Sequence, residues 1–407
     1  DEKLTLTDTS FVFNENFSGF KVNEDVKVSK FVYDLKKKTG TGDYVLNNLG
    51  SDFSIKKVTG RADISSKNIV TGTVRSNVLN GRYTVNPHTQ TVVVNANSSG
   101  YFTVNYGGKT YTVNPDVSNL IVKFNEKNML RSGQINAKIK DLSMPFVNTI
   151  NANVKIHNGN YNISGTAGIK GGGIVNISGT TSSNMKHSYS LKLPKNIDIA
   201  KLLRANGYNF KGLDKAKLPA TLTARISGSG DKISGSYQLY SPYGEYIGEY
   251  ENLHASGKIN DLANMDITVN TNMDELWFGY QRLKNVSGNL RIKDNVVNIT
   301  SIQNENLNAS GKFDMKTGKM DVNAGLRNYM IYNTAGPKVN LKVGTLDANL
   351  SGTIDKLSGE ITMPSAITSI NSNYVGDTNA YLRIKDGVVN FENVTLRENS
   401  LYGTYDL

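Results

Sequence analysis

The chain has 407 residues, a formal net charge of +11, 38% hydrophobic residues and no cysteine. The lack of cysteine excludes disulfides, thiol catalysis and cysteine-ligated zinc, and the apolar content is too high and too regular for a disordered chain. The 21 tyrosines, together with abundant Asn, Thr, Ser, Val and Gly, are typical of β-strands and turns. The basic residues are spread along the chain, which favours a solvated strand face over a nucleic-acid site, because such a site needs clustered charge.

The first half of the chain predicts a succession of strands. Alternating apolar and polar runs begin within residues 1–70, and two hairpins are expected at 82–94 and at 102–113. In the second hairpin a Gly-Gly pair would place Val104 opposite Tyr111. Further strands are expected from 117 to 193.

One helix is expected, over residues 196–206. Its apolar stripe is Ile199, Leu202 and Leu203, and it is too short to fold alone, so it must dock on the sheet. One interpretation is a lid or plug over an apolar surface. The other is a plain connection over 196–219 between two sheet segments, and connecting elements are commoner than lids.

One hairpin unit recurs, and its clearest copy lies near the C-terminal end. Residues 382–391 alternate between apolar and polar on both sides of the turn sequence Asp386-Gly387. The same unit occurs 92 residues upstream, at 290–299, where Asn295 replaces the glycine. Asparagine tolerates a positive φ better than other non-glycine residues, so the same turn is expected there. A looser copy lies at 154–163.

The strand pattern predicts an all-β fold. Counting ~12 residues for a strand with its turn gives about 30 strands, more than one ordinary open sheet or sandwich holds. We therefore expect an elongated, curled antiparallel sheet that stays open as a groove (a β-taco), with one short helix. Its first part would cover 1–195, the helix and connection 196–219, and a groove of β-repeats 220–407. Recurrent Ser-Gly dipeptides in the second half suggest many short strands.

An antiparallel sheet with one apolar face must cover that face. Since helices are nearly absent, the sheet can fold over on itself and enclose an apolar trough. An acyl chain suits such a trough, because a chain of ~15 methylenes would gain about 12 kcal/mol on leaving water. The alternative is a solid core in which the same side chains pack together. The residues expected to line the trough are Leu290, Ile292, Val297, Ile299, Leu350, Ile354, Leu382, Ile384, Val389, Phe391, Val394 and Leu396.

The repeats over about 220–407 resemble a known family. The form Leu-x-Ile-x-Asp-Gly-x-Val-x-Phe, followed by a second alternating strand, occurs from Leu382 to Leu396. Ser-Gly-x-Ile stretches at 350–354 and 357–364 fit the same pattern. Together they resemble the C-terminal β-repeat region of the TamB/AsmA-like family of envelope proteins in diderm bacteria.

That resemblance implies a periplasmic β-taco whose groove carries phospholipid between the inner and outer membranes. It also implies a part in outer-membrane protein assembly, within a translocation and assembly module. The implied partners are phospholipid and an Omp85-type (TamA-like) outer-membrane barrel that meets the C-terminal region of the full protein; no nucleic acid and no cofactor is implied. No stretch is long and apolar enough to span a membrane. We therefore expect a fragment of a longer protein whose inner-membrane anchor lies outside this sequence.

We do not expect an enzyme, because no nucleophile, base and oxyanion constellation can be assembled. Asp274 and Glu275 lie in turn-like sequence, and nothing marks either as buried. Gly171 to Gly173 lack the lysine and the helix of a phosphate loop, so a turn or bulge is the better interpretation. No metal site is expected, since the four histidines lack ligand spacing. They are His88, His157, His187 and His254.

A surface adhesin or autotransporter-type passenger, built as a β-solenoid, is the alternative function. The Asn-, Thr- and Gly-rich repeats favour it. A solenoid stacks its coils with a short fixed period of ~20–30 residues. The 92-residue offset and the Asp-Gly hairpin favour antiparallel strands instead.

Overall fold

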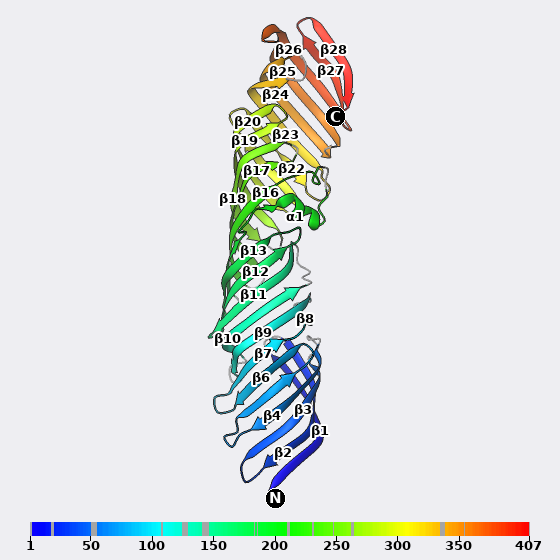
Figure 1. Cartoon of the computed structure of the whole chain (residues 1–407). Coiled ribbons are helices and arrows are strands. Elements are labelled where there is room, and N and C mark those ends of the chain that lie inside the picture. The colour runs from blue at the N-terminus through cyan, green and yellow to red at the C-terminus, as the bar shows by residue number, and fades with distance from the viewer. Residues whose placement is uncertain are drawn as a thin grey trace. The chain divides into compact units, whose positions relative to one another are not determined.

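The computed structural model is all-β, as predicted. Its described residues form 28 strands and one helix, and the strands belong to one open antiparallel sheet that does not close into a barrel within that part of the chain. Two compact units are present: Asp1–Lys170 with Ile174–Tyr189, and Gly171–Gly173 with Ser190–Leu407 (Figure 1). The structure describes residues 2–17, 20–49, 55–106, 109–123, 129–140, 146–182, 184, 186–209, 212–229, 232–246, 248–261, 264–333, 338–353 and 355–406.

In the first unit each strand pairs with the next, except that β9 pairs with both β7 and β8. Both predicted hairpins are confirmed: Tyr83 lies opposite Val94, and Val104 lies opposite Tyr111. The Gly-Gly pair at 107–108 lies outside the described residues. The strands are β1 (Lys3–Phe17), β2 (Phe20–Asp34), β3 (Thr39–Leu49), β4 (Ile55–Ile64), β5 (Val70–Arg75), β6 (Leu79–Asn86), β7 (Thr91–Ser98), β8 (Phe102–Tyr106), β9 (Lys109–Lys123), β10 (Met129–Lys140), β11 (Val147–His157), β12 (Asn160–Ile169) and β13 (Ile174–Thr181).

The second unit is a meander in which consecutive strands from β16 to β28 pair antiparallel. The unit boundary falls inside β14 (Lys186–Lys192). The further strands are β15 (Ile197–Asp198), β16 (Pro219–Ser229), β17 (Lys232–Glu245), β18 (Glu249–Asp261), β19 (Asp266–Phe278), β20 (Gln281–Lys293), β21 (Val296–Gln303), β22 (Leu307–Asp314), β23 (Met320–Asn333), β24 (Val339–Thr353), β25 (Lys356–Ile370), β26 (Asn373–Lys385), β27 (Val388–Leu396) and β28 (Asn399–Asp406).

The recurring hairpin unit is present at all three predicted places. Both central residues of each turn have a positive φ, for example 53° and 65° at Asp294 and Asn295, and 52° and 88° at Asp386 and Gly387. This turn geometry matches the twist of the flanking strands and needs Gly, Asn or Asp. The apolar pairs next to the turns are Ile156–Tyr161, Ile292–Val297 and Ile384–Val389.

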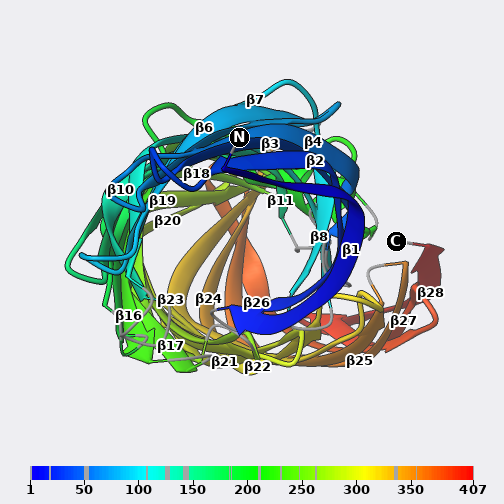
Figure 2. The same cartoon turned by 90° about the horizontal axis from the view of Figure 1, so that it is seen from below.

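The Ser-Gly dipeptides lie inside strands and not between them. Glycine is needed there because the neighbouring strand approaches closely: a Cβ on Gly257 would overlap the carbonyl oxygen of Thr268, and one on Gly311 that of Asp321. Aromatic rings also cover glycines on the opposite strand, as Tyr83 covers Gly72. The strands can therefore be longer than expected, and Figure 2 shows that they bend along their length.

Helix α1 spans Ile199–Ala205, which makes it shorter than the predicted 196–206 (green in Figure 1). Ile197 pairs with Ala220 instead, as part of β15. The Asp198 side chain then caps the helix by accepting a hydrogen bond from the Ala200 amide at 3.0 Å. The start of the helix is thus fixed by strand pairing at Ile197 and by the Asp198 cap.

Some of the buried apolar side chains form three small clusters, one in the first unit and two in the second. In the described part of the chain we find no single large core of the kind that a globular domain of this length would have. The clusters are Val58 with Val78, then Ala200 with Leu213 and Ala216, and then Val343 with Met363 and Ala366.

Candidate functional site

One continuous row of small and apolar residues crosses all thirteen strands from β16 to β28, and we call it row A. Each member lies directly opposite the next, so all members share one face of the sheet. Only Thr271 carries a polar side chain. Row A consists of Leu222, Leu239, Ala255, Thr271, Gly288, Ile302, Ala309, Ala324, Ala348, Ile361, Leu382, Phe391 and Gly403.

Two further rows, which we call the flanking rows, lie beside row A on the same face and on the same side of it. Away from the bulge in β21, their members lie two residues from row A in the first row and four in the second, and side chains at even spacing share a face. One runs through Val269, Leu290, Ile299, Gly311, Val322, Leu350, Gly359, Ile384, Val389 and Tyr405. The other runs through Ile226, Gly235, Ile259, Ile267, Ile292, Val297, Phe313, Met320, Gly352 and Leu357. We call this side of the second unit the apolar face.

The structure brings together the residues predicted to line a trough. Leu382 and Phe391 belong to row A, and seven others belong to the flanking rows. Val394 lies opposite Ala380, and Leu396 opposite Thr378, on the same face. Ile354 lies outside the described residues. A period-2 pattern was sufficient to assign the face, because strand alternation fixes it.

The side chains of the apolar face differ in exposure: a few are buried, and most are partly accessible to water. Ile384 and Val389 are buried, with 5% and 8% of their surface exposed, but most of the predicted lining residues are only half-buried. On the opposite face, polar side chains such as Gln238 and Ser256 are exposed. A solid core would bury these side chains fully, so the half-buried apolar face favours a trough.

The predicted lid residues lie in α1, and all three, Ile199, Leu202 and Leu203, are half-buried. Leu203 packs against a buried cluster of Ala200, Leu213 and Ala216. The sequence reasoning missed Ala200, Leu213 and Ala216 because two of them follow the helix and show no helical period.

The segment after α1 also reaches a distant turn. The hydroxyl of Tyr208 donates a 2.8 Å hydrogen bond to the side-chain oxygen of Asn295, 87 residues further along the chain. The same Asn295 holds the left-handed turn between β20 and β21. We call residues 199–209 and 212–218 the strap, and Tyr208 lies at its tip.

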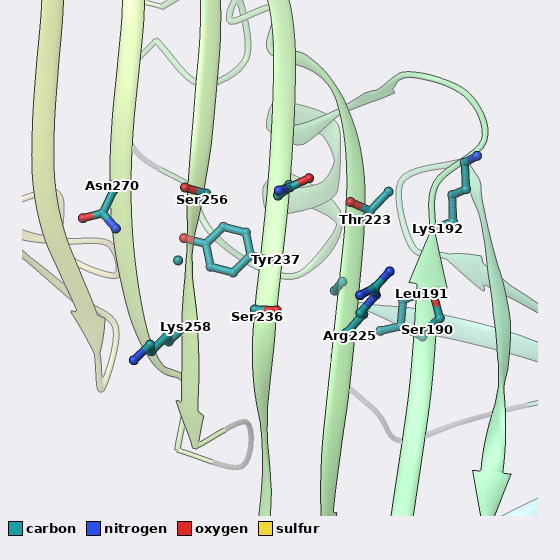
Figure 3. Close-up of a pocket in the computed structure, with 13 residues that line it drawn as sticks. Ser190, Leu191, Lys192, Thr223, Arg225, Ser236, Tyr237, Ser256, Lys258 and Asn270 are labelled. Carbon is teal, nitrogen blue, oxygen red and sulfur yellow. The ribbon is translucent and has the colours of Figure 1, made fainter.

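A depression of about 650 Å³ lies on the polar side of β14 and β16–β19 (Figure 3). Among its lining residues are three cations and no carboxylate: Lys192, Arg225 and Lys258. Figure 3 shows that Lys192 and Lys258 lie at opposite sides and point away from each other. The three charges therefore do not converge on one anion, and the depression is not the candidate site.

Two side chains near this region have shifted pKa values. Burial raises the pKa of Tyr237 to about 12, so its hydroxyl stays protonated and donates a 3.0 Å hydrogen bond to the Thr268 carbonyl. Hydrogen bonds from Arg291, at 2.9 and 2.7 Å, lower the pKa of Asp266 to about 2. Tyr237 joins β17 to β19 and Asp266 joins β19 to β20, and neither adjoins a second titratable group in the arrangement of an acid–base pair.

Within the described residues, no group of three or more His, Asp or Glu side chains is close enough to hold a metal ion. Their one helix is too short and too polar to cross a membrane. Comparison with protein-family models, with curated proteins and with solved structures gives no match. The resemblance of the repeats to the TamB/AsmA-like family therefore stays a prediction.

Proposed function

We propose that this protein transports lipid by holding acyl chains on the apolar face of its sheet. The observation that carries the proposal is row A together with its flanking rows. They place a band of apolar side chains across thirteen strands, and most of that band is only half-buried. Exposed apolar surface of this extent is costly in water and marks a binding surface.

The size of the band suits a sliding ligand. Thirteen strands spaced ~4.8 Å apart carry row A over about 58 Å of sheet. Each methylene that binds the band gains ~0.8 kcal/mol relative to water, wherever along the rows it lies. An acyl chain can therefore move along the band without losing its binding energy, while its head group stays in water.

The family resemblance suggests the setting for this activity. We propose a periplasmic bridge in a diderm bacterium that carries phospholipid between the inner and outer membranes, with an Omp85-type barrel as partner and a part in outer-membrane protein assembly. The proposal involves no catalytic step. The β-solenoid adhesin is not supported, because every strand pair with an assigned register in the second unit is antiparallel.

The test is to purify the chain from bacterial cells without detergent, extract it with organic solvent and analyse the extract by mass spectrometry. We expect phospholipid in at least stoichiometric amount. A stable, monomeric and lipid-free chain would contradict the proposal.

A further inference from the structure

The turns of the second unit lie along two opposite rims of the sheet. The β17–β18 and β19–β20 turns lie at the first rim, where Glu245 faces Glu249 and Phe278 faces Gln281. The β20–β21 turn lies at the second rim, at the far end of β20. A contact between the rims must therefore bridge the whole width of the sheet.

The strap begins and ends at the first rim. Ile197, before the strap, pairs with Ala220, and Lys217, near its end, pairs with Glu245. Asp198 ties the two ends together by accepting hydrogen bonds from the amides of Ala200 and Leu218. The tip nevertheless touches Asn295, which is in a turn at the second rim.

On a flat sheet this contact would be out of reach. The 13 residues of β20 separate the rims by ~40 Å. From its start to Tyr208 the strap has a seven-residue helix and three more residues, which together extend ~20 Å. The sheet must therefore curl until the two rims approach each other, and the strap closes the remaining gap.

Burial at the first rim indicates that the strap crosses the apolar face and not the polar one. Ala220 and Ser241, which lie on the apolar face at the first rim, are 2% and 1% exposed, and Ser241 is covered in part by Tyr250 of β18, whose hydroxyl lies 2.9 Å from its own. Their neighbour Tyr240 points to the other face and is 37% exposed. The side that the strap covers is thus the side that carries row A.

We propose that the strap is a latch that closes the apolar face between β16 and β21 and opens to admit a ligand from the side. Its base is fixed by strand pairing, by the Asp198 cap and by the buried cluster of Ala200, Leu213 and Ala216. Its tip is held by the hydrogen bond between two uncharged side chains and by packing of Tyr208 against the same cluster. Elements with so few tertiary contacts open locally while the rest of the fold stays intact.

The test uses the absence of cysteine from the chain. Ala255→Cys places a thiol in row A on β18, beneath the strap, and Ala348→Cys places a matched thiol in the same row on β24, beyond it. Ala255 and Ala348 are 9% and 7% exposed. Tyr208→Phe removes the tip hydrogen bond, and we expect thiol labelling at position 255 to become about 5-fold faster, with no change at 348.

A second tyrosine controls for general loosening. Tyr329 also donates a hydrogen bond, to the Arg282 carbonyl at 2.9 Å, but lies outside the strap. Tyr329→Phe should leave labelling at position 255 unchanged. Equal labelling rates at 255 with and without Tyr208→Phe, or equal acceleration by both tyrosine variants, would overturn the latch.

That the admitted ligand is a lipid rests on the proposed function, and this is tested in a separate experiment. Exchange of a fluorescent phosphatidylethanolamine from vesicles of phosphatidylethanolamine and phosphatidylglycerol should be faster with Tyr208→Phe. If the unmodified chain takes up no lipid, the proposed function fails while the labelling rates still decide the latch. If lipid exchanges but the labelling rates do not respond, the latch alone fails.

Discussion

Tyr237 lies directly opposite Gly257 across β17 and β18, and its hydroxyl would be 3.2 Å from a Cβ placed on that glycine. The tyrosine hydroxyl continues past the glycine to the Thr268 carbonyl on β19. One aromatic side chain therefore joins three strands, and the missing side chain of Gly257 leaves the space for it.

Gly257→Ala should lower the free energy of unfolding by ~1–3 kcal/mol, because its Cβ would overlap the Thr268 backbone and displace Tyr237. Urea unfolding monitored by circular dichroism measures the change. Gly403→Ala is the matched control: Gly403 belongs to row A, and a Cβ there meets no atom within 4 Å. A loss of equal size at Gly403 would mean that the cost comes from glycine flexibility and not from close approach.

Ile292→Glu should reduce the phospholipid that co-purifies with the chain several-fold. Ile292 is half-buried on the apolar face, so a carboxylate there places charge where an acyl chain would bind, and it can still reach water. Mass spectrometry of the extract measures the loss. Asn270→Glu, on the exposed polar face of β19, should leave the lipid content unchanged. If the Ile292 variant simply unfolds, and no folded form with less lipid can be isolated, the apolar face is not accessible to a ligand.

Met363→Ala should destabilise the chain by ~2–5 kcal/mol, because Met363 is 7% exposed and packs with Val343 and Ala366. The change is read from the urea midpoint. Ile367 lies on β25 beyond the bulge that follows Met363, so it points to the other face, and it is 45% exposed. Ile367→Ala should therefore change stability by no more than ~0.5 kcal/mol. If the two variants lower the free energy of unfolding equally, Met363 and Ile367 do not differ in burial as described.

Asp266 should make stability depend on pH in the acid range. Hydrogen bonds from Arg291 lower the pKa of Asp266 in the folded state to about 2, below the ordinary aspartate value of 3.8, so the native state favours the ionised carboxylate. The stabilisation is fully present above pH ~4 and is lost as the pH falls towards 2. The difference in urea midpoint between the natural chain and Asp266→Asn should therefore be constant from pH 5 to 7 and shrink below pH 4. A difference that stays constant down to pH 2 would show that Arg291 does not hold the charged form.

Local patterns were sufficient to predict most of the fold from the sequence. The hairpins at 154–163, 290–299 and 382–391 follow from alternation around residues that accept a positive φ. The lining residues follow from the same alternation. The strand lengths were underestimated, because a glycine within a strand looks the same in sequence as a glycine in a turn. Which of the two applies depends on how closely the next strand approaches.

The strap contact could not have been predicted in the same way. Tyr208 and Asn295 are 87 residues apart, and neither belongs to a periodic pattern that connects them. Their meeting depends on how far the sheet curls, which is the sum of small bends over several strands. No local sequence pattern reports the total curl of the sheet, whereas strand alternation is visible in the sequence at every second residue.

The antiparallel meander also limits how such a chain can change in length. Adding or losing one hairpin shifts everything downstream by two strands, so every later turn stays on its own rim and every apolar residue on its own face. Adding or losing a single strand would reverse the direction of all the strands that follow and exchange the two rims. Asn295 would then lie on the same side as the base of the strap, out of reach of Tyr208. Insertions and deletions in this protein are therefore expected to add or remove even numbers of strands, with the hairpin as the duplicated unit.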